Sequence, residues 1–257
     1  MIKKRRLQRV TLQAYQVPSL QISSPIALTT EQRHYLCNVL RLETESEFIV
    51  LDRQGGWWLA KLSSDLDIAE VIAKLENNSE LSTSLTLGIA MPKGSNIESV
   101  IRQTTELGVR QIVPLFSDRT IIKSGTDIGN QKRDRWQRIA EESAELSMRN
   151  YVPEINIPQT LTSWLDALAN STLPACKYIC VTSPNAPHLL TSLQKSNGEE
   201  TSEIIVTTGC EGGWTTREEE IAIASGFIPV SLGDRVLSAI TAPVVALSLV
   251  SAFLDTQ

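Results

Sequence analysis

The sequence predicts an α/β protein built on a mainly parallel sheet and preceded by a smaller β-rich segment. From Leu85 onward, β-branched runs alternate with helical patterns, which is typical of a parallel sheet with helices on both faces. Before residue 76, strand patterns dominate and only one helical pattern occurs. A chain of 257 residues has room for one large domain or two modest ones.

The first 75 residues contain one predicted helix and three predicted strands. Thr29 or Thr30 can cap the helix, whose apolar positions continue to Leu40. The strands are expected at residues 48–51, 57–62 and 68–75, and the first two flank a glycine turn that predicts a hairpin. The polar stretch 76–80 reads as a linker, which places two domains at residues 1–76 and 82–257.

The second segment is predicted to alternate strands and helices. Strands are expected near Leu85, Ile112, Ile155, Tyr178, Ile204 and Ile228. Helices are expected at residues 97–107, 133–148, 161–168, 187–193, 216–224 and 243–254. Asn96 can cap the first of these helices, and Gly108 stands where a C-terminal glycine is expected.

Composition excludes several classes of protein. The longest apolar stretch, residues 242–254, is shorter than the roughly twenty residues of a membrane span. The basic N-terminal run is not followed by an apolar segment, so no secretory signal is expected. Four cysteines without C-x-x-C spacing indicate reduced thiols in a cytoplasmic protein. With only two histidines, we expect no metal site.

Charge is distributed unevenly along the chain. Residues 1–75 carry ten Lys/Arg and eight Asp/Glu, whereas the rest carries 14 and 21. Five of the first ten residues are basic. A local basic patch on an acidic protein can hold a polyanion such as RNA, although a solvated terminus would give the same pattern.

A glycine-rich turn follows the strand predicted at Ile204. It reads Gly209-Cys210-Glu211-Gly212-Gly213, and a helix begins after it at Thr215 or Thr216. The carboxyl ends of parallel strands are where such sheets bind ligands, and glycines let the backbone approach them. The spacing fits neither a dinucleotide fingerprint nor a P-loop. A simple tight turn is the alternative.

Two further segments could complete a pocket beside this turn. A short strand ends at Leu232-Gly233, and the apolar run after it is otherwise explained by core packing. Lys93 ends an earlier strand and could face the pocket edge, although a solvated loop lysine is the simpler interpretation. Two glycine loops at adjacent strand ends would form two walls of one ligand site.

Taken together, these segments resemble the RsmE family, the uridine-N3 methyltransferases of 16S ribosomal RNA in the knotted SPOUT class. The matching motifs follow one another in order along nearly the whole chain. They are His34, Leu36 and Val39-Leu40-Arg41; Lys93; Glu106-Leu107-Gly108-Val109; Pro114; Ser117-Asp118-Arg119; Arg135-Trp136; Ile139; Glu142-Ser143-Ala144-Glu145; Arg149; Val152-Pro153; Gly209-Cys210-Glu211-Gly212-Gly213; Leu232-Gly233-Asp234-Arg235-Val236-Leu237; and Thr241-Ala242.

The sequence departs from the family pattern beside the second glycine loop. Ser238 and Ile240 stand where the family usually has an arginine and a glutamate. The joint loss suggests that the two charges form a pair in other members, because losing one alone would leave a buried unpaired charge. Cys210, Gln103 and Leu146 also replace the usual proline, lysine and glutamine. A catalytically weakened paralogue that binds RNA or S-adenosylmethionine (AdoMet) is therefore the alternative to an active enzyme.

The resemblance implies a fold, a cofactor and partners. It implies a SPOUT-like parallel sheet with a C-terminal trefoil knot, preceded by a PUA-like β-barrel that binds RNA. It further implies AdoMet in the knot loops, a homodimer, and the small ribosomal subunit as substrate.

The resemblance also assigns site residues. Those expected to bind AdoMet are Thr207, Gly209, Glu211, Gly212, Gly213, Leu232, Gly233, Val236, Leu237 and Thr241. Those expected to bind RNA are Arg9, Arg41, Lys93 and Arg119. Methyl transfer needs no metal, but uracil N3 must lose its proton, so a nearby cation helps. Arg235 is the candidate, and a salt bridge with an acidic neighbour is its alternative role.

Overall fold

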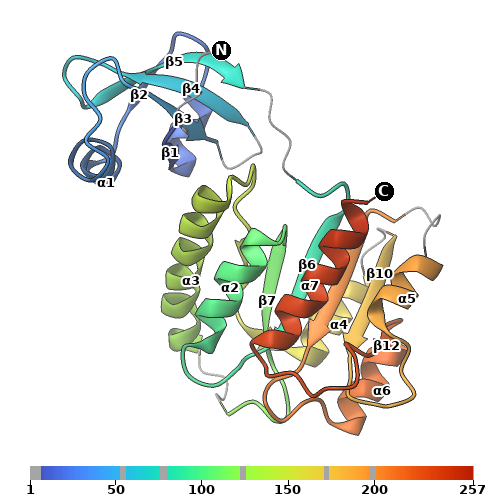
Figure 1. Cartoon of the computed structure of the whole chain (residues 1–257). Coiled ribbons are helices and arrows are strands. Elements are labelled where there is room, and N and C mark those ends of the chain that lie inside the picture. The colour runs from blue at the N-terminus through green and yellow to red at the C-terminus, as the bar shows by residue number, and fades with distance from the viewer. Residues whose placement is uncertain are drawn as a thin grey trace. The chain divides into compact units, whose positions relative to one another are not determined.

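The computed structural model describes residues 7–52, 56–75, 80–121, 126–170, 174–196 and 201–256. The chain divides into two compact units, each drawn in Figure 1. The N-terminal unit contains Met1–Glu80 and Met148–Tyr151. The C-terminal unit contains Leu81–Ser147 and Val152–Gln257.

The N-terminal unit is a curled five-stranded sheet with strand order β1-β3-β4-β5-β2. Its strands are β1 (Arg9–Thr11), β2 (Pro25–Ala27), β3 (Glu47–Leu51), β4 (Trp57–Leu62) and β5 (Ile68–Leu75). The expected hairpin is confirmed, since β3 pairs antiparallel with β4. Residues 53–55 of its turn and 76–79 of the predicted linker lie outside the described residues.

The predicted helix of this unit is present, but it changes type. Thr29 caps α1 (Thr30–Arg33) by accepting a hydrogen bond from the Gln32 backbone, and the Gln32 side chain bonds back to Thr29. The chain then continues as the π-helix η2 (His34–Val39). The sequence patterns did not reveal β1, β2 or the 3₁₀ helix η1 (Ala14–Ser19), whose short runs carry little periodicity.

A buried ion pair ends the N-terminal unit. The Glu80 and Arg149 side chains are 12% and 3% exposed, and the guanidinium donates to both carboxylate oxygens. The backbone N–H groups of Asn150 and Tyr151 also donate to Glu80. Glu80 is the last residue of the predicted polar linker, and its carboxylate holds the Met148–Tyr151 segment.

The C-terminal unit is built on a parallel sheet with strand order β12-β10-β11-β6-β7-β8, and β9 also pairs with β7. The strands are β6 (Ser84–Ala90), β7 (Gln111–Phe116), β8 (Glu154–Ile155), β9 (Gln159–Thr160), β10 (Ala175–Cys180), β11 (Glu203–Thr208) and β12 (Ile228–Val230). All six strands predicted here are confirmed, and the parallel pairing is confirmed. Passage of the chain through a knot stays a prediction of the resemblance.

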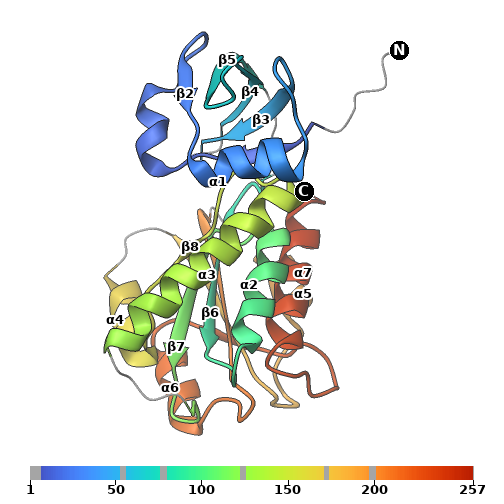
Figure 2. The same cartoon turned by 90° about the vertical axis from the view of Figure 1, so that its left-hand side faces the viewer.

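Helices cover both faces of this sheet. They are α2 (Asn96–Glu106), α3 (Thr126–Ser147), α4 (Leu161–Ala169), α5 (Leu189–Lys195), α6 (Thr216–Ala224) and α7 (Thr241–Leu254). Figure 2 shows α3, α2 and α7 as neighbours on one face. The opposite face is covered by α4 and α6, which contribute Trp164 and Ala222 to a separate core cluster. Prediction of helices on both faces is thus confirmed.

Helix ends differ from prediction in a few places. Ser95 is the N-cap residue of α2, and the expected cap Asn96 is its first helical residue. His188 caps α5, which therefore begins two residues after Pro187, and α3 begins at Thr126 rather than Arg133. Gly108 follows α2 with φ +95°, as expected for a C-terminal glycine.

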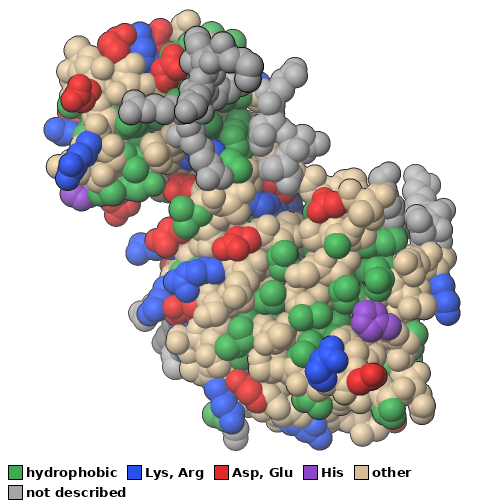
Figure 3. All heavy atoms as spheres, viewed as in Figure 1, with side chains coloured by type: hydrophobic (Ala, Val, Ile, Leu, Met, Phe, Trp, Pro, Cys, Tyr) green, Lys and Arg blue, Asp and Glu red, His purple; other side chains and the backbone are tan. Residues whose placement is uncertain are grey.

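The last helix, α7, buries one side only. Pro243, Ala246, Leu247, Val250 and Leu254 are buried, and their spacing defines one helical face. Leu249 and Phe253 are half-buried and pack against the same core, whereas Val244 and Val245 are half-exposed on the remaining surface. Hydrophobic side chains also gather over this helix and its neighbours in Figure 3.

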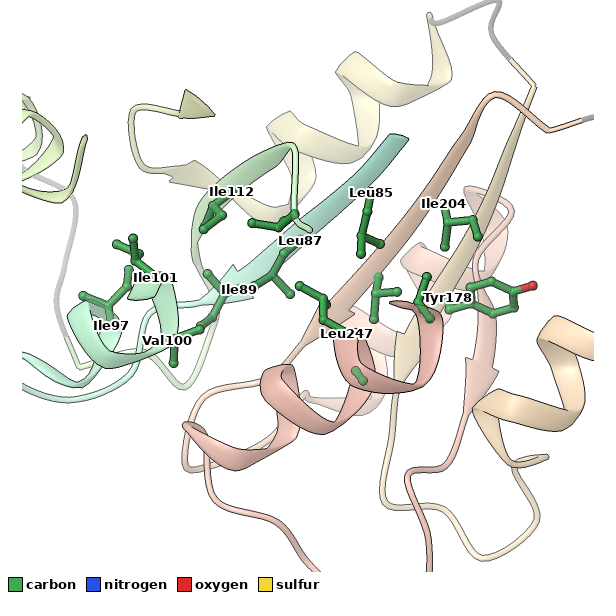
Figure 4. Close-up of a cluster of buried hydrophobic side chains, with 14 of the residues drawn as sticks. Leu85, Leu87, Ile89, Ile97, Val100, Ile101, Ile112, Tyr178, Ile204 and Leu247 are labelled. Atoms are coloured by element: carbon green, nitrogen blue, oxygen red, sulfur yellow. The ribbon is translucent and has the colours of Figure 1, made fainter. Parts of the chain in front are cut away.

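The core of the C-terminal unit follows from strand alternation. On β6, Leu85, Leu87 and Ile89 are fully buried against the cluster that includes α2 and α7, with Leu247 facing them in Figure 4. Gly88 points to the opposite face, where a Cβ would lie 2.3 Å from the Trp164 ring. This alternation places large residues on one side and leaves room for a tryptophan on the other.

The carboxyl ends of the parallel strands gather several loops at one edge of the sheet. They include the loops after β6, β7, β10, β11 and β12, and Figure 1 draws them together at its lower edge. No helix in the described part of the chain is long and apolar enough to cross a membrane.

Candidate functional site

A cavity of about 300 Å³ lies at this edge, between the loops that follow β11 and β12. Its volume is at the lower end of the range for small-molecule sites. The lining comes from four places in the chain. It is formed by Arg119; Cys180, Val181 and Thr182; Thr208 to Trp214 with Glu219; and Leu232 to Leu237 with Ala239 and Ala242.

The first wall is the glycine turn after β11. Gly213 has φ +67°, a conformation that side chains with a Cβ rarely adopt. A Cβ on Gly209 would lie 3.0 Å from the Gly213 Cα, so the turn closes on itself only without side chains. Cys210 and Trp214 are buried in the core and anchor the turn at two points. The sequence therefore shapes this wall by glycines and fixes it by apolar side chains.

The second wall is the loop between β12 and α7. The Ser231 hydroxyl accepts a hydrogen bond from the Gly233 backbone N–H, which shapes the turn. The residues after it, Leu232 to Leu237, face the cavity, and Val236 is 84% exposed. An apolar side chain so exposed at the cavity rim is available to a ligand.

Charged side chains of both signs line the cavity. Three carboxylates, those of Glu211, Glu219 and Asp234, line it together with Arg119 and Arg235. Burial raises the pKa of Glu219 above its usual value, and the nearby Arg119 opposes that rise. The excess of carboxylates favours a ligand that carries positive charge.

Neutral polar groups in the lining also bear on the ligand. Two buried atoms of lining residues, Thr208 Oγ1 and Trp214 Nε1, have no hydrogen-bond partner among the described residues. Buried polar atoms normally have a partner, so these two are consistent with a bound ligand completing the site.

Burial raises the pKa of the Cys180 thiol to about 12, which keeps it neutral. Among the described residues, no group of His, Cys, Asp or Glu could hold a metal ion.

The structure brings together most residues that the resemblance assigned to AdoMet. Gly209, Glu211, Gly212, Gly213, Leu232, Gly233, Val236 and Leu237 line the cavity, as does Arg235. Thr207 does not, because it is fully buried and donates to the Gly88 carbonyl. Its neighbour Thr208 lines the cavity instead. Thr241 lies at the start of α7, 3.0 Å from Ser238 by their hydroxyls, and is not part of the lining.

The residues assigned to RNA lie in three places. Arg119 lines the cavity. Lys93 has an exposed side chain, and its backbone N–H donates to the Glu211 carboxylate, which joins the loop after β6 to the glycine turn. Arg9 and Arg41 belong to the N-terminal unit. Arg41 is exposed with φ +54°, whereas Arg9 lies over the Trp57 ring at 5.4 Å.

Sequence reasoning missed the contribution of Cys180, Val181 and Thr182 to the lining. Cys180 ends β10 and the other two follow it, and β10 lies between β12 and β11. Their place after a predicted strand was the available signal, since all strands of a parallel sheet end at the same edge. The strand order that brings β10 next to β11 could not be read from the pattern.

Comparison with known proteins gives the class. Residues 79–251 match the RNA methyltransferase domain family, and residues 28–73 match the RNA methyltransferase PUA domain family. Fold and site thus define an RNA methyltransferase with a PUA domain and a SPOUT-like catalytic domain.

The relatives give the family. Ribosomal RNA small subunit methyltransferase E of Synechocystis sp. is 42% identical, covering 93% of this chain and 77% of the relative. The enzyme of the same name from Bacillus subtilis is 30% identical, covering 88% and 89%. The crystal structure of the Neisseria gonorrhoeae enzyme bound to S-adenosyl methionine covers 98% and 100%, with 25% identity and a TM-score of 0.84. The chain belongs to the ribosomal RNA small subunit methyltransferase E family, the RsmE family indicated by its motifs.

Proposed function

We propose that this protein methylates N3 of a uridine in 16S ribosomal RNA, with AdoMet as the methyl donor. The observation that carries the proposal is the cavity between two glycine loops, which holds unpartnered polar atoms and excess carboxylate in a chain of this family. The Neisseria relative with S-adenosyl methionine supports the choice of cofactor.

The residues of the cavity fit this cofactor. AdoMet, when bound, supplies a methyl group on a positively charged sulfur, and the carboxylates of Glu211, Glu219 and Asp234 provide compensating charge. The backbone of the two glycine loops can approach a flat, polar adenosine group closely because no Cβ intervenes. Leu232, Val236 and Leu237 offer apolar contact. Thr207 would not touch the cofactor. Its hydroxyl donates to the Gly88 carbonyl and so would hold the strand behind the lining in place.

Chemistry on the RNA side requires an acceptor nitrogen without its proton. Arg235 lines the cavity and makes no hydrogen bond or ion pair with any described residue. This observation favours the role of a cation that stabilises the uracil anion over a structural salt bridge. The protein would also hold the acceptor nitrogen in line with the methyl group, about 3 Å away.

A weakened paralogue is the second candidate function, and the residues at the altered positions support it. The Ser238 hydroxyl accepts a hydrogen bond from the Thr241 backbone N–H, at the start of α7. Ile240 packs partly against the core. Both replacements are therefore used to build the helix start, and neither can transfer a proton in place of an acid or base.

We further propose the arrangement of domains and partners. The PUA-like domain, residues 1–76, would bind the RNA, and residues 82–257 would form the knotted methyltransferase domain. A second copy would cover the half-exposed apolar side of α7, giving a cytoplasmic homodimer.

Mass spectrometry of ribosomal RNA nucleosides from a deletion strain tests the proposed function. Loss of N3-methyluridine, restored by the wild-type gene, is the expected result. Calorimetric titration with AdoMet should show binding to wild type and little to Gly213→Val, which forces a branched residue into φ +67°. A normal nucleoside profile together with AdoMet and RNA binding would favour the paralogue.

A further inference from the structure

Arg119, which the family resemblance assigns to RNA binding, joins two loops of the proposed cofactor site. Arg119 lies in the loop after β7, and its Nη1 atom donates to the carbonyls of Gly212 at 2.6 Å and Trp214 at 2.9 Å. The side-chain stem lies along the glycine turn, since a Cβ on Gly212 would be 3.1 Å from the Arg119 Cβ and Cδ. The guanidinium thus holds two carbonyls of the first cavity wall.

The same two loops are joined in the opposite direction by a buried carboxylate. Glu218 is 3% exposed and accepts hydrogen bonds from the backbone N–H groups of Asp118 and Thr215, both at 2.8 Å. The Thr215 hydroxyl lies 3.0 Å from Glu218 and 3.1 Å from Asp118. The loop after β7 and the first turn of α6 therefore each supply one charged side chain that binds the backbone of the other segment.

We infer that Arg119 and Glu218 form a latch that holds the Gly209–Trp214 turn in its cofactor-binding conformation. Arg119 is then a positioning residue for the cofactor site. The turn contains three glycines, so its backbone has many alternative conformations that the latch excludes. The inference rests on the proposed AdoMet function. It differs from the expectation that Arg119 binds an RNA phosphate.

The surroundings of the two cavity arginines support a positioning role for Arg119 and a role on the substrate for Arg235. Arg235 has no hydrogen bond or ion pair in the described part of the chain, whereas Arg119 donates twice to carbonyls. Charge-assisted hydrogen bonds are among the stronger ones, so these two bonds hold the Arg119 guanidinium firmly against the turn. Arg119 also lines the cavity together with Glu219 and opposes the rise that burial causes in the Glu219 pKa, so its removal would change the charge of the site.

The test is calorimetric titration of the full chain with AdoMet in the absence of RNA. We expect Arg119→Ala to bind AdoMet at least about tenfold more weakly, a difference of about 1.4 kcal/mol. Arg119→Lys, which can reach one carbonyl, should lie between Arg119→Ala and wild type. Arg102→Ala removes the same charge from an exposed position on α2 and should bind as wild type does.

RNA binding and steady-state kinetics separate this role from a merely structural one. Arg119→Ala should raise the KM for AdoMet and leave the RNA dissociation constant and its salt slope unchanged. Glu218→Gln keeps the shape of the cap but turns one acceptor into a donor, so it should weaken AdoMet binding in the same direction. The Glu218→Gln variant also keeps the inference testable if Arg119→Ala does not fold.

Either of two results would overturn the inference. One is wild-type AdoMet affinity in folded Arg119→Ala with a flatter salt slope for RNA, which would assign Arg119 to a phosphate. The other is unchanged AdoMet affinity in both Arg119→Ala and Glu218→Gln. Absence of AdoMet binding by the wild type would instead overturn the proposed function, and the inference with it.

Discussion

Arg235 is the residue whose surroundings leave it free to act on the substrate. Its guanidinium lies over the second glycine turn, with Nη2 3.9 Å from the place of a Cβ on Gly233. Arg235→Ala should therefore lower methyl transfer at least about tenfold, or about 1.4 kcal/mol, because it removes one electrostatic interaction with the anion. Single-turnover transfer of labelled methyl to small-subunit RNA measures this.

The same variant separates chemistry from cofactor binding. AdoMet affinity of Arg235→Ala should change far less than the rate, and Arg235→Lys should recover part of the rate. Wild-type rates in Arg235→Ala would remove this side chain from the mechanism. No transfer by the wild type to any small-subunit substrate would favour the binding-only paralogue.

Glu219 gives the site a pH-dependent contribution to stability. Burial raises its pKa in the folded protein, so the charged form is less favourable there than in the unfolded chain. The stability that this group contributes is present below its unfolded pKa of about 4.3 and is lost as pH rises through the folded value. Glu219→Gln should therefore have a higher unfolding midpoint than wild type at pH 7.

That difference should shrink as pH falls toward 4, because protonation of Glu219 then increases in the unfolded state as well as in the folded one. Melting curves of both proteins without ligand, taken between pH 4 and 7, provide the measurement. A wild-type midpoint above that of Glu219→Gln at pH 7 would mean that attraction to Arg119 outweighs burial.

At the scale of elements, the packing of α4 on the sheet depends on one glycine of β6. A Cβ on Gly88 would lie 2.3 and 2.6 Å from two atoms of the Trp164 ring, which is held in the core beside Phe227. Gly88→Ala should destabilise the protein by about 1–3 kcal/mol, the usual cost of overpacking a core. Denaturant unfolding measures it.

A double-mutant cycle identifies the cause. In a Trp164→Leu background the penalty of Gly88→Ala should be smaller, because the atoms that clash are gone. An equal penalty in both backgrounds would place the strain in the backbone of β6 instead.

Helices and strands whose ends are set by neighbouring residues could be predicted from the sequence. Those that exist only through pairing with distant segments could not. Thr215 and Glu218 cap α6 within a few residues of each other, and α6 was predicted with its observed ends. By contrast, β1 is a three-residue strand defined by pairing with β3. The role of Arg119 depends on carbonyls 93 and 95 residues away, so no spacing in the sequence could indicate it. The cavity loops were found because glycines mark them locally.

At the scale of the whole molecule, RNA binding is expected to depend on charge in the N-terminal unit. Arg41 is exposed, whereas Arg9 lies against the Trp57 ring. Arg41→Glu should lower RNA affinity and flatten the salt slope by roughly 0.7 to 0.9 for each phosphate that the variant no longer binds. Filter binding across a salt series is the measurement. Arg9→Glu should reduce the stability of the unit as well, because it removes a cation–π contact.

The comparison needs a charge control on the other unit. Arg138→Glu changes an exposed arginine of α3 by the same charge. If Arg138→Glu lowered RNA affinity and flattened the salt slope as much as Arg41→Glu, the N-terminal unit would not be the part that binds the RNA.

The proposed homodimer can be tested on the side of α7 that carries half-exposed apolar side chains. Val244 and Val245 of α7 are half-exposed, and hydrophobic side chains gather on this face of the C-terminal unit in Figure 3. A homodimer would cover them, and a chain of 28.4 kDa should then sediment with twice that mass at micromolar concentration. Val245→Glu should shift the protein toward monomer, because it places a charge in an apolar contact. Leu146→Glu makes a similar exchange at a residue already 79% exposed on α3 and should leave the mass unchanged. A wild-type monomer would contradict the dimer, and the exposed side of α7 would then need another partner.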